Sequence, residues 1–165
     1  MSVDGMTQAA RAVHAGEGDL VWFTNNLMTV KATAETTGGA YGLVEALAPV
    51  GASPPLHIQR GEDETFYVLE GKLSLHHPDG SVEFGPGGAA FAPRGVPHAY
   101  RVESETARWL AIATPAGFDA FVREVGEPAP EDVLPPEGRV HDSARLGEVA
   151  ARYDIELLGP PGTLP

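Results

Sequence analysis

The chain has 165 residues, the length of one domain that can bury a substantial core. Its 11 basic and 23 acidic residues give a formal net charge of -12, which argues against nucleic acid and anionic membranes as partners. It contains no cysteine, which excludes disulfides, thiolate metal sites and cysteine nucleophiles. No signal-peptide pattern or membrane-length apolar stretch is found, so we expect a soluble, cytoplasmic protein.

The first 20 residues show no sustained hydrophobic period and are predicted to form a flexible arm. Residues 21–114 are predicted to fold into short strands separated by turns rich in glycine and proline. The strands are expected at 21–23, 28–33, 41–47, 65–69, 72–76, 81–84, 89–92, 99–102 and 108–113. Such regular spacing predicts an all-β sandwich or barrel, in which the Asp79-Gly80 pair forms the clearest hairpin turn.

The hydrophobic period changes after Pro115. Apolar residues with the i, i+3, i+4, i+7 spacing of one helix face occur at 118–125 and again at 146–153. Asp142 or Ser143 is the expected N-cap of the second helix, and residues 155–158 are expected to add a last strand. We expect this extension, residues 115–165, to pack on the outside of the barrel or across its mouth, and a role as a lid is the alternative.

Candidate metal ligands concentrate between residues 51 and 102. His57 and Gln59 lie two residues apart, so on a strand both side chains point to the same face. Glu64 can return to that place after a turn, and His98 opens another strand. Two imidazoles, a carboxylate and an amide oxygen that converge inside a barrel would bind a divalent first-row metal. In the alternative, Gln59 hydrogen-bonds Glu64 or water in a pocket without a metal.

Two motifs in this region resemble the two sequence motifs of the cupin superfamily. They are Gly51-x5-His57-x-Gln59-x4-Glu64-x6-Gly71 and Gly87-x5-Pro93-x-Gly95-x2-His98. The C-terminal part is similar to small single-domain cupins of the quercetin 2,3-dioxygenase type. The resemblance implies an all-β cupin barrel, a double-stranded β-helix or jelly roll, with short C-terminal helices.

In that family the motif histidines and glutamate bind one divalent transition metal (Mn, Fe, Co, Ni, Cu or Zn), which implies His57, Glu64 and His98 as ligands here. The second histidine of the first motif is replaced by Gln59, and the asparagine expected near the end of the second motif is Val102. Because a primary amide is a poorer and harder ligand than imidazole, this replacement is expected to lower the metal affinity.

Strand parity also predicts pocket residues. Phe66 has the parity of Glu64, and Tyr100 has the parity of His98, so both are expected to line the substrate pocket. Other candidates occupy turns or polar loops, and no role in the site is expected for them. They are Asp63, His14, His76, His77 and His141.

The resemblance implies a metal-dependent dioxygenase that acts on a small aromatic or enolisable, flavonol-like substrate. Glu64 would serve as metal ligand, as general base, or as both. The alternatives are a non-oxidative cyclase, isomerase or lyase, and a cupin that binds a small molecule without catalysis. Cupins commonly form homodimers by exchange of N-terminal strands, and the apolar segments within 21–33 are suited to this exchange.

Overall fold

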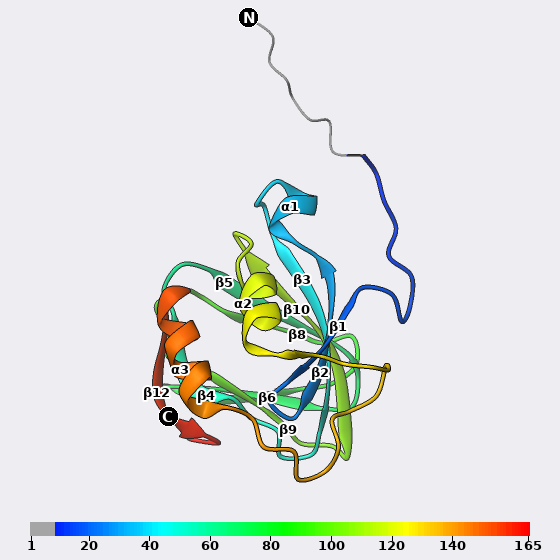
Figure 1. Ribbon diagram of the computed structural model, residues 1–165. Helices are drawn as coiled ribbons and strands as arrows, with labels where there is room; N and C mark the ends of the chain where they lie inside the picture. The colour runs from blue at the N-terminus through cyan, green and yellow to red at the C-terminus, as the bar shows by residue number, and fades with distance from the viewer. Residues whose placement is uncertain (1–8) are drawn as a thin grey trace, which may run out of the picture.

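The computed structural model describes residues 9–165, and part of the predicted arm, residues 1–8, lies outside the described residues (Figure 1). The strands are β1 (Asp19–Phe23), β2 (Asn26–Ala32), β3 (Gly42–Pro49), β4 (Pro55–Gln59), β5 (Asp63–Glu70), β6 (Leu73–His77), β7 (Gly80–Phe84), β8 (Ala89–Ala92), β9 (Ala99–Val102), β10 (Thr106–Thr114), β11 (Glu127–Pro128) and β12 (Ile155–Pro161). The helices are α1 (Ala34–Thr37), α2 (Phe118–Val125) and α3 (Ser143–Arg152).

The strands form three antiparallel sheets around one apolar core. The largest sheet has the order β11-β1-β2-β3-β10-β5-β8, and the smaller sheets are β7-β6-β9 and β12-β4. Along β3 and β10 every second side chain is buried, the period of a strand with one face on the core. Trp109, Phe66 and Leu73 are each 1% exposed or less in this core. The predicted all-β jelly-roll class is confirmed.

The predicted strands between residues 21 and 114 all occur, each within two residues of its expected bounds. The predicted hairpin also occurs: β6 and β7 pair His77 with Gly80, whose φ of 137° lies outside the range that other residues readily adopt. β4 was not among the expected strands because its start, at Pro55, belongs to a pair of prolines that indicates a turn. α1 is a single capped turn between Thr33 and Gly38, too short to show a helical period.

Both predicted helices occur at the expected apolar stripes, and Asp142 caps α3 by accepting from the backbone N–H of Arg145 at 2.9 Å. Their buried residues, among them Phe121 and Leu146, join the apolar core of the sheets. The expected last strand is present as β12, which pairs with β4. Figure 1 shows β12 next to α3, and α3 packs against α2. The extension therefore forms part of the wall around the interior.

The described residues before β1 contain no strand. Lys31 on β2 donates hydrogen bonds to the carbonyl oxygens of His14 and Glu17, at 2.9 and 2.6 Å, which holds this segment against the sheet. β1 and β2 pair with each other, and β2 pairs with β3 of the same chain. Between residues 9 and 165, no helix has the length and apolar character needed to cross a membrane.

Candidate functional site

Three of the predicted ligands meet inside the barrel. His57 lies on β4 and Glu64 on β5, and His98 directly precedes β9. The backbones of His57 and His98 form an antiparallel bridge with N–H to O distances of 3.2 and 3.0 Å, which places the two ring centroids 4.5 Å apart. One ligand atom from each of His57, Glu64 and His98 lies within 4.8 Å of the others, a spacing suited to a metal ion.

Backbone carbonyls orient both imidazole rings. Nδ1 of His57 lies 2.8 Å from the Pro55 carbonyl oxygen, and Nδ1 of His98 lies 3.0 Å from that of Val96. Because a carbonyl can only accept, Nδ1 of each ring carries the proton, and each Nε2 is left with the lone pair that a metal requires. Nε2 of His98 is also 3.4 Å from Oε2 of Glu64, so these two groups can share a proton or bind a common cation.

The two histidines of the cluster differ in their electrostatics. Burial and the neighbouring His98 lower the pKa of His57 to about 4, so this ring is neutral at neutral pH, as coordination requires. Burial also opposes charge on His98, but its hydrogen bond to Glu64 and the charge of Glu64 outweigh burial and raise the pKa of His98. A divalent cation in the cluster would compete with a proton at His98.

Gln59 lies two residues after His57 on β4 and lines the same cavity. The side chain is 2% exposed, and its Nε2 donates to Oε1 of Glu62 at 3.3 Å. Its Oε1 is buried and has no hydrogen-bond partner among the described residues. Buried polar atoms are almost always paired, so this oxygen is suited to a ligand that completes the site. Two imidazole nitrogens, a carboxylate and an amide oxygen fit a divalent first-row metal. The alternative bond from Gln59 to Glu64 is not formed.

Glu62 was not predicted as part of the site. It lies in the turn between β4 and β5, is 6% exposed, and its Oε2 accepts the backbone N–H of Phe118 at 3.1 Å. Burial and the nearby charge of Glu64 raise the pKa of Glu62 to about 7. The sequence signal that indicates Glu62 is weak, because an acidic turn next to Asp63 is also typical of a solvated loop.

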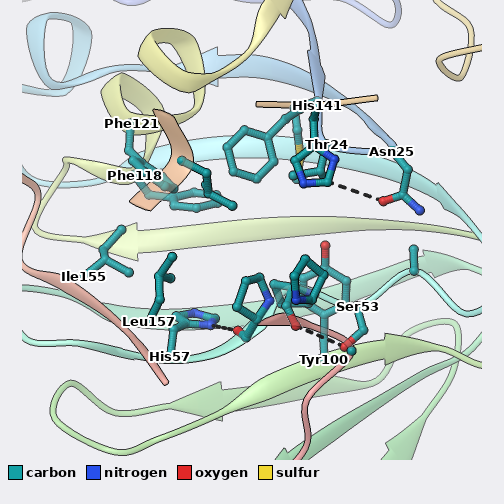
Figure 2. Close-up of a pocket in the computed structure, with 18 of the residues that line it drawn as sticks. Thr24, Asn25, Ser53, His57, Tyr100, Phe118, Phe121, His141, Ile155 and Leu157 are labelled. Atoms are coloured by element: carbon teal, nitrogen blue, oxygen red, sulfur yellow. Dashed lines mark hydrogen bonds between the residues drawn. The ribbon is translucent and has the colours of Figure 1, made fainter. Parts of the chain in front are cut away.

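A cavity of about 390 Å³ opens onto the cluster and includes His57, Gln59 and Glu64 in its lining. Figure 2 shows His57 and Leu157 facing Phe118 and Phe121 across this space, with His141 also on the far side. The apolar part of the lining comes from strands β1, β2 and β12 and from both helices. It includes Phe23, Met28, Phe118, Phe121, Leu146, Ile155 and Leu157.

Comparison with known proteins identifies a family for the segment that carries the cluster. A family model described as "Cupin domain" matches residues 43–113, the segment that carries His57, Gln59, Glu64 and His98. The chain therefore carries a cupin domain. It is 25% identical over 148 residues to quercetin 2,3-dioxygenase of Bacillus subtilis (strain 168), a match that covers 90% of this cupin and 44% of the relative. The chain therefore spans less than half the length of that relative.

Solved structures share the fold at lower identity. A protein described as a predicted oxalate decarboxylase from Thermotoga maritima superposes with a TM-score of 0.59 at 22% identity, covering 64% of this cupin and 99% of that chain. The polyketide cyclase RemF from Streptomyces resistomycificus superposes with a TM-score of 0.54 at 21% identity, and the match covers 84% of this cupin and 92% of that chain. At these identities the likeness establishes the fold alone.

Of the two pocket residues expected from strand parity, Tyr100 lines the cavity and Phe66 does not. Tyr100 lines the cavity, burial raises the pKa of its hydroxyl, and its oxygen accepts from Nδ2 of Asn26 at 2.7 Å. Phe66 is not among the lining residues. It is 1% exposed and packs edge-on against Tyr100, with ring centroids 6.0 Å apart. Parity gives the face of a strand but not the depth of a side chain, so the prediction for Phe66 is corrected.

The connector between the helices adds residues that the sequence did not indicate. Arg139 and His141 both line the cavity, a position that the polar sequence around them did not indicate. Arg139 donates to the Thr24 carbonyl at 2.8 Å and pairs with Glu127 at 2.9 Å, which fixes the connector against the β1–β2 turn. These residues lie in irregular backbone, where no periodicity relates them to the barrel.

The other discounted residues lie elsewhere. Asp63 pairs with Arg94 at 3.0 Å on the surface, and His76 hydrogen-bonds Ser74 at 2.8 Å on the small sheet. Neither belongs to the lining of the cavity.

Proposed function

We propose that this cupin is a metal-dependent dioxygenase that acts on a small aromatic or enolisable, flavonol-like substrate. The observation that carries the proposal is the cluster of donor atoms at His57, Glu64 and His98, of which His57 and Glu64 line a mostly apolar cavity of about 390 Å³. This volume lies within the usual range of small-molecule sites. The similarity to quercetin 2,3-dioxygenase supports oxidative chemistry.

The ligands would be His57, Gln59, Glu64 and His98, each contributing one atom. A divalent first-row metal held there would stabilise negative charge on a substrate oxygen, and a redox-active ion would also permit reaction with dioxygen. Glu64 faces the cavity and can accept the proton of a substrate hydroxyl. His98, 3.4 Å from Glu64, can share that proton.

The opposite wall would bind the substrate ring. Phe118 and Phe121, with ring centroids 6.0 Å apart, present apolar surface there, and Leu157 adds apolar surface from the side of His57, so that water is excluded from the reacting oxygen. Arg139 is the basic residue in the lining and is already paired with Glu127. The cavity is therefore suited to a neutral or weakly charged molecule rather than to a polyanion.

The test combines metal analysis with an oxygen electrode. We expect near-stoichiometric metal in protein purified without chelators, and oxygen uptake when a panel of flavonols is added. Absence of uptake by fully metallated protein would contradict the dioxygenase. Product formation without oxygen would instead support a cyclase or isomerase, which the Glu64–His98 pair could serve through proton transfer alone. Tight binding without turnover would support a binding cupin.

A homodimer remains a prediction from the sequence. In one chain β2 pairs with β3, so exchange of N-terminal strands would replace this pairing by the same pairing between two chains. Light scattering tests it, with a molar mass of twice 17.3 kDa as the expected result and a monomer as the contrary one.

A further inference from the structure

Glu62 connects the ligand cluster to the aromatic wall through one carboxylate. Its Oε1 accepts from Nε2 of Gln59 at 3.3 Å, and its Oε2 accepts from the backbone N–H of Phe118 at 3.1 Å. Gly117 permits this approach, since a Cβ at that position would lie 3.3 Å from Oε2. The two regions that surround the cavity thus meet at a side chain that is 6% exposed.

The chemistry of the two groups determines how the Gln59 amide is turned. A primary amide has a donating end and an accepting end, whereas a carboxylate only accepts. In its ionised form Glu62 therefore selects the NH₂ end of Gln59, and the carbonyl end is the one left without a partner. If the Gln59 amide were turned by about 180°, its NH₂ group would point toward the cluster instead, and an NH₂ group cannot coordinate a cation.

We propose that Glu62 is a positioning residue, which holds the oxygen of Gln59 toward the metal site and fixes the start of α2 in relation to it. The inference rests on the proposed metal site. Glu62 itself contributes no ligand atom, and it acts on the metal only through the orientation of Gln59. The same carboxylate places Phe118, the first residue of the aromatic wall, at a fixed distance from the cluster.

Glu62→Gln tests this role because it preserves size and removes one acceptor. The single amide oxygen of the variant cannot serve both Gln59 and the Phe118 N–H, so one of them meets an NH₂ group. We expect the affinity for Co²⁺, measured by competition with a chelating dye, to fall by about 10-fold to 100-fold, the usual effect of losing an outer partner of a ligand. Asp63→Asn, which removes the neighbouring surface carboxylate, is the matched control and should leave the affinity unchanged.

The exchanged pair Gln59→Glu/Glu62→Gln provides the rescue. In this double variant the new amide can donate to the carboxylate at position 59 and accept from Phe118, which leaves one carboxylate oxygen for the metal. We expect the double variant to bind Co²⁺ at least about 10-fold more tightly than Glu62→Gln, as the same outer-partner effect requires. It should also exceed Gln59→Glu alone, in which two carboxylates face each other. A role limited to stability would not produce this reciprocal rescue.

The outcomes separate two failures. If the original protein binds Co²⁺ and Glu62→Gln binds it equally well, or if the effects of the two substitutions add without coupling, the positioning role is wrong and the metal site stands. If the original protein binds no Co²⁺, both the metal site and the positioning role are wrong. Should Glu62→Gln fail to fold, the comparison of the double variant with Gln59→Glu decides the question.

Discussion

The two sides of the cavity are built in different ways. The ligand cluster comes from residues 57–98, on strands β4 and β5 and directly before β9, where a backbone bridge fixes His57 beside His98. The facing wall comes largely from the extension, through α2 and α3, whereas β12 of the same extension pairs with β4 on the side of the ligands. We infer that metal affinity and substrate preference are separable properties, carried by different parts of the chain and joined at Glu62.

The largest expected effect follows from removing the carboxylate of the cluster. Glu64→Ala deletes both a ligand and the proposed base, so kcat should fall about 100-fold or more. Oxygen uptake with the best flavonol measures it, and circular dichroism should show an intact fold. Asp63→Asn should retain activity, because Asp63 pairs with Arg94 outside the cavity. Retention of activity by Glu64→Ala would show that the base is assigned to the wrong residue.

Replacing Gln59 by histidine should raise the metal affinity. Gln59→His restores an imidazole, whose Nδ1–H can donate to Glu62, so the affinity for Co²⁺ should rise about 10-fold. Competition titration against a chelating dye measures the change. An unchanged or lower affinity would mean that the side chain at position 59 does not point at the metal.

A substitution in the aromatic wall should change KM for the substrate and leave the metal affinity unchanged. Phe118→Ala removes apolar surface worth about 1.5 kcal/mol, so KM for an aromatic substrate should rise about 10-fold. The backbone N–H that Glu62 accepts is kept, and the affinity for Co²⁺ should stay the same. Phe91→Ala, on the exposed face of β8, is the matched control and should change neither quantity. A fall in metal affinity in Phe118→Ala would contradict the separation of the two sides.

The smallest effect concerns the contact between α2 and α3. Tyr153 donates to Glu124 at 2.7 Å, and this bond, together with Arg152, outweighs burial and holds the pKa of Glu124 below its usual 4.5. The folded state therefore binds this proton less readily than the unfolded state, so stability falls as the pH drops below about 4.5. We expect Tyr153→Phe to lose less stability than the original protein over that range.

Urea unfolding of metal-free protein at about pH 7 and about pH 4 measures this difference. Tyr67→Phe, on the exposed face of β5, is the control and should follow the original protein. An equal loss of stability in Tyr153→Phe and the original protein would show that the Glu124 contact contributes nothing at acid pH.

The difference between the two sides of the cavity also explains which features the sequence could predict. The spacing of His57 to Glu64 and the turn before His98 determine the cluster, because a strand alternates its faces with a fixed period. The helices at 118–125 and 146–153 follow from their apolar stripes, but a stripe does not specify which sheet it covers. The places of His141 and Glu62 depend on irregular backbone, where no period connects a residue to distant elements.

The pairing of β12 with β4 has a consequence for the order in which the protein can assemble. Ile155 and Leu157 pair with Gln59 and His57, so the strand that carries two of the ligands takes its neighbour from a segment about one hundred residues further along the chain. On the ribosome, β4 lacks that neighbour until residues 155–161 have emerged. The proposed metal site therefore reaches its final geometry only late in the synthesis of each chain.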